Sequence, residues 1–261
     1  MSRPKNNLTG LKRRIHLNRL LSKRGVLTRS QANAAILAGR VSVDGRVVRD
    51  PGQPVAESAR VTVDAEPTAR RSWRTILFHK PRGVMTTRAD PEGRETIYDV
   101  LGEAGRGLIP VGRLDRATSG LLLLTSDTHL ADRITDPGSA VSRVYVASVR
   151  GRMAQEDCER LEQGVVDNGE QLKADTVTLR KPSGRESHLV VTLSEGKNRE
   201  IRRLFETIGH PVTRLKRVAL GGLTLDDLAP GKWRELNEAD VRRIFPILVL
   251  ASFVSVVVNV L

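Results

Sequence analysis

A run of four leucines, residues 121–124, is short and is bounded on both sides by turn-forming residues. This pattern is typical of a strand that is buried on both of its faces. Asp127 follows at the position of a helix N-cap, so we expect a short helix to begin at Thr128. Asp115 therefore lies on a loop that leads directly into a core strand.

Two further segments have the pattern of strands, residues 75–80 and residues 142–151. In the second segment the alternation places Arg143 and Tyr145 on one face and the intervening valines on the other. From the pattern alone, Tyr145 could be a core aromatic residue whose hydroxyl reaches water.

An amphipathic helix is predicted within residues 198–209. Its apolar positions fall at helical spacing and are Ile201, Leu204, Phe205 and Ile208. We expect Asn198 to cap this helix and Gly209 to end it. The arginines of its first turns can reach beyond the buried face, and they are Arg199, Arg202 and Arg203. A second amphipathic helix is expected at residues 154–163.

The N-terminal part of the chain predicts a small separate domain. After a flexible basic arm at residues 1–12, we expect two short helices and then a hairpin that turns at Asp44-Gly45. We place this domain at residues 13–64 and a linker at residues 65–72. Five of its cations could form a face for phosphates, and they are Lys23, Arg24, Arg29, Arg40 and Arg46. They could equally be solvated surface charges.

The charge of the chain points to a polyanionic partner. The net charge is +13, and residues 1–60 carry 13 Lys and Arg against 3 Asp and Glu. Nucleic acid is the first candidate for such a partner and an anionic membrane the second. The single cysteine, Cys158, cannot form an internal disulfide, which favours a reducing compartment and a cytoplasmic location. The five histidines show no ligand spacing, so we expect no metal site.

Asp115 is the principal candidate for chemistry. It lies between Arg113 and Arg116, two cations that would favour its ionised form. A loop beside a rigid strand is a suitable mount for a catalytic group. Judged by residue type alone, however, Asp115 would be an aspartate in a surface ion pair.

Four motifs of the chain resemble those of known RNA-modifying proteins. The sequence GRLDRATSGLLLLTSD resembles the catalytic motif of the RsuA-type pseudouridine synthases, which modify ribosomal RNA. Two further motifs of that family are matched by KPRGVMTT and by EGKNREIRRLFETIGHPVTRLKR, and residues 17–48 resemble an S4 RNA-binding domain. The resemblance implies an α+β fold, with a mostly antiparallel sheet and flanking helices at residues 73–244 in addition to the S4 domain.

The resemblance also assigns roles to individual residues. It implies that Asp115 is the nucleophile, that Tyr145 stacks on the target base and that Arg202 pairs with Asp115. It implies that Leu204 packs beneath the aspartate, and that Lys80 and Arg113 contribute to the substrate cleft. No cofactor or metal is expected, because the isomerisation loses no electrons and a carboxylate can act as nucleophile. The sequence does not separate attack on ribose C1′ from a route through a glycal.

The expected partner is ribosomal RNA, either free or in an assembling subunit. The segments RADPEGR and EGKNREIRRLF favour the large-subunit RNA. Two other functions stay open: a non-catalytic S4-type protein of ribosome assembly, and a glycosidase-like hydrolase, which would need a second carboxylate. We expect a monomer.

The chain ends in an apolar segment at residues 245–261, of which twelve are Phe, Ile, Leu or Val. As a helix it would be about 26 Å long, shorter than a hydrocarbon core of about 30 Å. This length argues against a membrane as partner, although the apolar character of the segment leaves that possibility open. The segment could also pack on the protein as a strand, or be an incidental extension.

Overall fold

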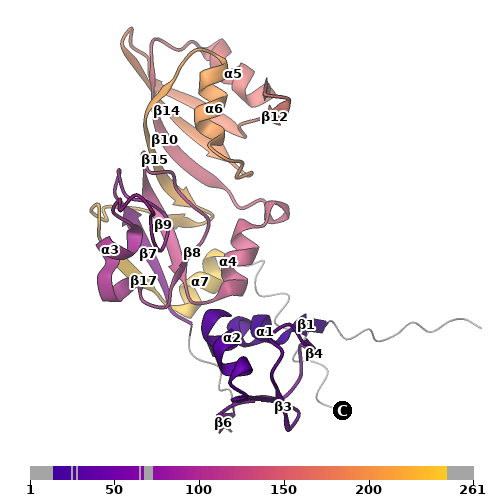
Figure 1. Cartoon of the computed structure of the whole chain (residues 1–261). Coiled ribbons are helices and arrows are strands. Elements are labelled where there is room, and N and C mark those ends of the chain that lie inside the picture. The colour runs from indigo at the N-terminus through magenta and orange to yellow at the C-terminus, as the bar shows by residue number, and fades with distance from the viewer. Residues whose placement is uncertain (1–13, 25, 28, 65, 68–72, 246–261) are drawn as a thin grey trace, which may run out of the picture. The chain divides into compact units, whose positions relative to one another are not determined.

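The computed structural model describes residues 14–24, 26–27, 29–64, 66–67 and 73–245. The chain divides into two compact units, Met1–Trp73 and Arg74–Leu261, and we describe each by itself (Figure 1). The expected basic arm at residues 1–12, most of the expected linker and residues 246–261 of the apolar segment lie outside the described residues.

The first unit contains the two helices and the hairpin that the sequence predicts. Its helices are α1 (Leu17–Lys23) and α2 (Arg29–Leu37). A four-stranded sheet has the order β3 (Arg46–Val48), β2 (Val41–Val43), β5 (Val61–Val63) and β6 (Glu66–Pro67). A second sheet pairs β1 (Arg14–His16) with β4 (Pro54–Ala56). Strand β6 lies within the segment expected to be a linker, where it pairs with β5.

The turn between β2 and β3 forms where the sequence indicates it. Asp44 and Gly45 both have positive φ, 49° and 82°, as a two-residue hairpin turn requires. Leu17, Leu20 and Leu21 of α1 are buried against α2 and the strands and form the core of this unit. The two helices and the hairpin are thus as predicted, whereas the pairing of β2 with β5 and of β1 with β4 was not predicted.

The second unit is built on a nine-stranded sheet. Its main order is β13 (Thr176–Lys181), β14 (Glu186–Leu193), β10 (Arg143–Arg150), β15 (Val212–Leu220), β9 (Thr118–Thr125), β7 (Thr75–Lys80) and β17 (Trp233–Leu236). Two short strands complete it, β8 (Ile109–Pro110) on β9 and β16 (Leu223–Thr224) on β15. Neighbouring strands of this sheet are antiparallel, except that β15 and β9 are parallel. The predicted α+β class with a mostly antiparallel sheet is thereby confirmed.

Helices and one hairpin flank this sheet. The helices are α3 (Ile97–Leu101), α4 (Thr128–Thr135), α5 (Gln155–Gln163), α6 (Glu200–Thr207) and α7 (Glu238–Ile244). Short 3-10 turns lie at Gly102–Gly105 and Pro137–Ser139. The hairpin pairs β11 (Val165–Asp167) with β12 (Glu170–Leu172) around Asn168-Gly169. Helices α5 and α6 lie with β12 at one end of the unit, while α3, α4 and α7 lie near the other (Figure 1).

The leucine run forms the central strand β9, and both of its faces are buried. Leu122 and Leu124 belong to one hydrophobic cluster, whereas Leu121 and Leu123 belong to another. All four side chains are fully buried. Asp127 caps α4 by accepting bonds from the main-chain N–H groups of the next turn. The strand and the cap are therefore as predicted, and they anchor the loop that carries Asp115.

The predicted cap of α6 is wrong. The N-cap position is occupied by Arg199, whose φ is +49°, and its side chain makes no capping bond. The carboxylate of Glu200 accepts a bond from the Lys197 main-chain N–H at 3.1 Å and so stabilises the turn instead. Asn198 lies one residue too early to cap this helix.

Phe245 is the one residue of the expected apolar C-terminal segment, residues 245–261, that the structure describes. Phe245 is buried in the cluster that contains Leu223 and Val241, so it belongs to the folded unit. Within the residues that the structure describes, no helix is long and apolar enough to cross a membrane.

Candidate active site

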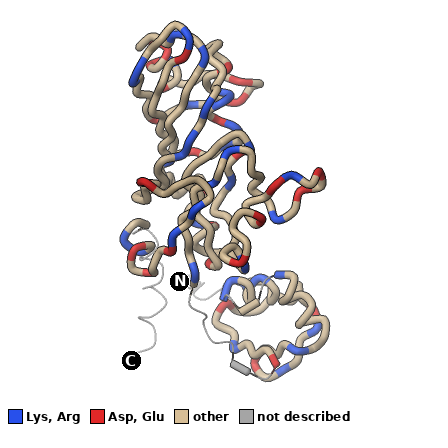
Figure 2. Tube along the Cα trace, turned by 90° about the vertical axis from the view of Figure 1, so that its left-hand side faces the viewer, with Lys and Arg blue, Asp and Glu red and all other residues tan. Residues whose placement is uncertain are grey.

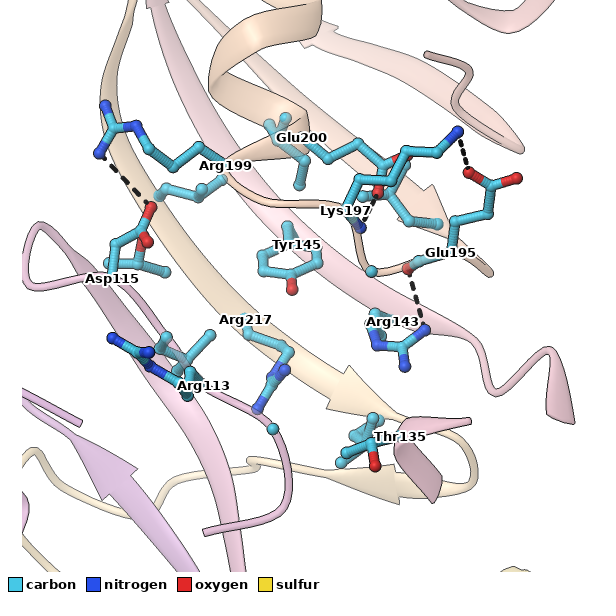
Figure 3. A pocket seen from close by; sticks show the side chains of 18 of the residues that line it. Arg113, Asp115, Thr135, Arg143, Tyr145, Glu195, Lys197, Arg199, Glu200 and Arg217 are labelled. Carbon is cyan, nitrogen blue, oxygen red and sulfur yellow. Dashed lines mark hydrogen bonds and ion pairs between the residues drawn. The ribbon is translucent and has the colours of Figure 1, made fainter. Parts of the chain in front are cut away.

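A cleft of about 600 Å³ lies where the loop before β9 faces α6 and the strands β10 and β15 (Figure 3). Its acidic lining residues are Asp115, Glu195 and Glu200. Its cationic lining residues are Arg113, Arg143, Lys197, Arg199, Arg202 and Arg217. The cleft is therefore a cationic pocket of a size that suits a small ligand or a single nucleotide.

Asp115 lies at the wall of this cleft with its side chain one-third exposed, at 34%. Its Oδ2 atom is 3.7 Å from Nη1 of Arg199 and 3.9 Å from Nε of Arg202. Its sequence neighbours are not its partners: Arg116 donates to the carbonyl of Gly83, and Arg113 lines the cleft. The guanidiniums at ion-pair distance from Asp115 come instead from the start of α6, because that helix docks against the loop.

Arg202 is held rigidly beside Asp115. Its Nη1 donates to the carbonyl of Val212 at 3.1 Å and its Nη2 to the carbonyl of Ala117 at 3.2 Å. Its Nε is buried and has no hydrogen-bond partner among the described residues. Burial and the charge of Arg199 lower the pKa of Arg202, whereas Asp115 raises it. The structure therefore brings Arg202 and Asp115 together at ion-pair distance.

Tyr145 lies at the centre of the cleft (Figure 3). It is buried to 9% exposure and shares the face of β10 with Arg143, as the alternation predicted. Arg143 is also buried, and it donates to the carbonyls of Val141, Ser194 and Glu195. Arg143 thus fixes the loop that leads to α6, while the ring of Tyr145 faces the space between Asp115 and this loop.

Lys80 and Leu204 do not line the cleft. Both side chains are fully buried. The Nζ of Lys80 donates to the carbonyls of Pro81 at 3.0 Å, Asp115 at 3.2 Å and Thr118 at 2.9 Å. Burial lowers the pKa of Lys80 to about 8, an effect that the nearby Asp115 opposes. Lys80 therefore supports the Asp115 loop from beneath, and Leu204 packs in the hydrophobic cluster that contains Leu114.

Glu200 is a site residue that the sequence did not single out. Its side chain is 3% exposed, and its Oε1 has no hydrogen-bond partner among the described residues. Burial raises its pKa to about 7. In the sequence, the position of Glu200 next to Arg199 only weakly indicated a site residue. An acidic residue in the first turn of a helix is usually exposed and interacts favourably with the helix dipole.

Arg217 was missed for a similar reason. It lies on β15 opposite Tyr145 and is 3% exposed, and its Nε donates to the carbonyl of Leu121 at 2.7 Å. The main chain of Arg217 approaches Gly120 so closely that a Cβ atom there would lie 2.2 Å from its carbonyl oxygen. Gly120 of the sequence motif is therefore required by the packing of β9 on β15.

Comparison with known proteins identifies the family. A family model described as RNA pseudouridylate synthase matches residues 74–207, and an S4 domain model matches residues 17–61. An "uncharacterized RNA pseudouridine synthase" of Aquifex aeolicus is 38% identical over 233 residues, which cover 88% of this chain and 94% of the relative. The chain belongs to the RNA pseudouridylate synthase family.

Two further comparisons agree with this family. The ribosomal large subunit pseudouridine synthase B of Bacillus subtilis is 35% identical over 230 residues, covering 87% of this chain and 94% of the relative. A crystal structure of a pseudouridylate synthase superposes with a TM-score of 0.63 and 25% identity, covering 88% of this chain and 99% of that chain. The chain is thus a pseudouridine synthase with an N-terminal S4 domain.

The S4 domain of this synthase does not present all five expected cations freely. Lys23 forms an ion pair with Glu57, and Arg24 donates to the carbonyls of Glu57 and Ala59. Arg40 donates to the carboxylate of Asp64. These three cations already have partners, because residues 57–64, which follow β4, lie against them. Arg29 and Arg46 are exposed.

The described part of the chain contains no group of three or more His, Cys, Asp or Glu side chains arranged to hold a metal ion. Cys158 is buried and unpaired.

Proposed function

We propose that this synthase isomerises a uridine of large-subunit ribosomal RNA to pseudouridine, with Asp115 as the nucleophile. The Bacillus subtilis relative named for the ribosomal large subunit supports the choice of RNA, since it is matched over 94% of its length. One observation carries the assignment of the nucleophile. Asp115 is the carboxylate that faces the cleft within 4 Å of two guanidiniums and beside the aromatic ring of Tyr145.

The reaction requires a nucleophile and a means of turning the base. The N1–C1′ bond breaks, the uracil rotates, and a C5–C1′ bond forms. The base then loses its C5 proton and gains one at N1, so atoms and electrons balance without an oxidant. The carboxylate of Asp115 either attacks C1′ or assists departure of the uracil through a glycal. Arg202, fixed by two carbonyls, orients this carboxylate for either route.

Tyr145 and the cations would hold the target nucleotide. The uridine must leave its stack to enter the cleft, which costs a few kcal/mol and favours loops or strained RNA. Stacking on Tyr145 offsets about 1–3 kcal/mol of that cost. Arg113 lines the same cleft next to Asp115 and would contact the incoming nucleotide.

The S4 domain would supply sequence-independent affinity. Arg29 and Arg46 are its best candidates for phosphate contacts, because both are exposed. Lys23, Arg24 and Arg40 would first have to exchange the partners described above. Each phosphate contact makes binding weaken as salt concentration rises.

We further propose that one chain is sufficient for activity and that the reaction occurs in the cytoplasm. All the residues around Asp115 come from the second unit of a single chain, which supports a monomer. A single buried, unpaired cysteine fits a reducing compartment.

The decisive experiment is pseudouridine mapping across ribosomal RNA from cells that express this chain. The comparison is with cells that express Asp115→Ala, and the control is Asp227→Asn, an exposed carboxylate away from the cleft. We expect one large-subunit site that appears with the native chain and the control and is absent with Asp115→Ala. If soluble protein binds RNA but produces no site that depends on Asp115, the chain is an RNA-binding assembly protein instead.

A further inference from the structure

We infer that Arg199 is an exchangeable partner of Asp115, which holds the carboxylate in the free enzyme and moves to a backbone phosphate of the substrate RNA when RNA binds. This inference rests on the proposed function, and it assigns to one residue the coupling between RNA binding and release of the nucleophile.

The two arginines beside Asp115 differ in how they are held. The side chain of Arg202 is 12% exposed and is bonded to two carbonyls. The side chain of Arg199 is 54% exposed, and within the described residues its guanidinium has one charged partner, Asp115. Arg202 is thus a fixed partner, whereas Arg199 can leave without breaking any other contact that the structure shows.

The contact between Arg199 and Asp115 is weak enough to be exchanged. Its 3.7 Å separation is longer than a charge-assisted hydrogen bond, which is about 2.7–2.9 Å. An exposed ion pair of this kind contributes little, because water screens it. A phosphate can accept two parallel bonds from one guanidinium, so it competes well for the same group.

The main chain beneath Arg199 is held in place, so that its side chain can move alone. Arg199 has a φ of +49°, a left-handed conformation that persists where the surroundings impose it. The surroundings do so here: Glu200 binds the Lys197 N–H, and Arg143 binds the carbonyls of Ser194 and Glu195. Arg199 is therefore a long flexible cation on a rigid base at the mouth of the cleft (Figure 3).

Among the cations that line the cleft, Arg199 combines an exposed side chain with a contact to Asp115. Arg143 and Arg217 are buried, and Lys197 is bound to Glu195 and to the carbonyl of Gln171. Arg113 and Arg199 are the exposed members of this set, and Arg199 is the one at ion-pair distance from Asp115. Lys and Arg positions recur along the strands and loops of the second unit (Figure 2), so an RNA backbone has favourable charge on its approach.

Movement of Arg199 from Asp115 to a phosphate would change the charge that surrounds the Asp115 carboxylate. Both guanidiniums approach the same oxygen, Oδ2 of Asp115. Departure of Arg199 leaves the carboxylate oriented by Arg202 with one fewer positive charge beside it. A carboxylate that is less neutralised by its partners is a stronger nucleophile, so the nucleophile would be released when a phosphate is in place.

The test combines a side-chain change with removal of single phosphate charges. The substrate is a ribosomal RNA stem-loop that contains the mapped uridine, with methylphosphonate replacing one phosphate at a time on either side of that uridine. The variants are Arg199→Gln, Arg199→Lys and the control Arg214→Gln, an exposed cation of β15 outside the cleft. The measurements are Kd, its salt dependence and the single-turnover rate.

We expect one methylphosphonate to weaken binding to the native enzyme about tenfold and to have no further effect on Arg199→Gln. Arg199→Lys should keep part of the sensitivity, and Arg214→Gln should respond as the native enzyme does. The slope of log Kd against log salt should fall by about 0.7 in Arg199→Gln, the value for one contact to a single strand. A purely structural role of Arg199 would not abolish the response to one phosphate.

The inference is overturned if Arg199→Gln and the native enzyme lose the same affinity at every modified phosphate. This outcome is distinct from failure of the proposed function. In that second case the native enzyme forms no more pseudouridine than Asp115→Asn on any ribosomal RNA, and the inference then falls with it.

Discussion

The ammonium group of Lys80 donates to the main-chain carbonyl of Asp115 at 3.2 Å from a position with no solvent exposure. The same ammonium binds the carbonyls of Pro81 and Thr118, so it joins the end of β7 to both sides of the Asp115 loop. The main chain of Asp115 is thus fixed by the buried ammonium of Lys80, while its carboxylate lies at ion-pair distance from Arg199 and Arg202.

Replacing Lys80 should therefore impair catalysis without removing RNA affinity. In Lys80→Met three carbonyls lose a buried donor, and each unsatisfied group costs about 1–3 kcal/mol. We expect the single-turnover rate to fall at least about tenfold, because a displacement of about 1 Å at the reacting group can cost a hundredfold. The Kd for RNA should change less than about threefold. Lys181→Met, at an exposed lysine, is the control; an unchanged rate in Lys80→Met would contradict the role.

Asp115→Asn should abolish turnover while leaving RNA binding nearly intact. The amide is nearly isosteric with the carboxylate but cannot form the covalent bond to C1′ or act as a base. We expect a loss of at least about a thousandfold in single-turnover rate and a Kd within about threefold of the native value. Measured turnover equal to that of the native enzyme would rule out Asp115 as the nucleophile.

Tyr145 should contribute mainly through its ring. Tyr145→Leu removes base stacking, which is worth about 1–3 kcal/mol per base, so the Kd for substrate RNA should rise about tenfold to a hundredfold. Tyr145→Phe keeps the ring and should retain most of that affinity. Tyr98→Phe is the matched control, since its hydroxyl binds the carbonyl of Leu108 outside the cleft. If Phe and Leu at position 145 weaken binding equally, the stacking role is wrong.

Glu200 should make stability depend on pH. Burial raises its pKa to about 7 from an ordinary value of 4.5, so between these values the folded state keeps a proton that the unfolded state has released. The free energy of unfolding should fall as pH rises through this range, by on the order of 3 kcal/mol in total. Above about pH 7 the Glu200 carboxyl is ionised in the folded state as well, and the free energy of unfolding has fallen by the full amount.

Glu200→Gln cannot ionise and should remove this dependence. Relative to the native protein, the variant should gain stability steadily between pH 4.5 and 7.5 in urea unfolding. Glu206→Gln removes an exposed carboxylate from the same helix and serves as the control. A stability difference between Glu200→Gln and the native protein that is the same at pH 5 and pH 8 would show that the carboxyl is not desolvated.

The central strand should be sensitive to loss of volume. Leu122 is fully buried in the larger cluster, so Leu122→Ala should lower the free energy of unfolding by about 2–5 kcal/mol. Val146 lies on β10 with 42% exposure, and Val146→Ala should cost less than about 1 kcal/mol. Chemical denaturation of the two variants under the same conditions compares them directly, and similar losses would contradict the assignment of β9 to the core.

Local sequence features predicted the elements of this protein because their causes are local. The leucine run specified a strand buried on both faces, Asp127 specified the start of α4, and Asp44-Gly45 specified a hairpin turn. Each depends on contacts or dihedral angles within a few residues. The cap of α6 failed as a prediction because Glu200 satisfied the same turn from the other side.

The motifs also placed Asp115, Tyr145 and Arg202 in one site, and the structure brings these three residues to one cleft. The partners of Asp115 could not be read from its neighbours. Arg199 and Arg202 reach it only because α6, far along the chain, docks beside the loop. Arg113 and Arg116 are near Asp115 in the sequence, but the loop directs their side chains elsewhere, so they are not its ion-pair partners among the described residues.

The sequence by itself predicted most strands and helices, the S4 domain and the candidate nucleophile, because hydrophobic period, turn residues and motifs are local features of the chain. Only the tertiary structure decided which charged side chains are buried. Lys80, Glu200 and Arg217 have the composition of surface residues, yet packing of β7, α6 and β15 removes them from water and directs their polar atoms to carbonyls and to the cleft. The burial of a charged residue depends on what the rest of the chain places around it, and the residues beside it in the sequence do not contain that information.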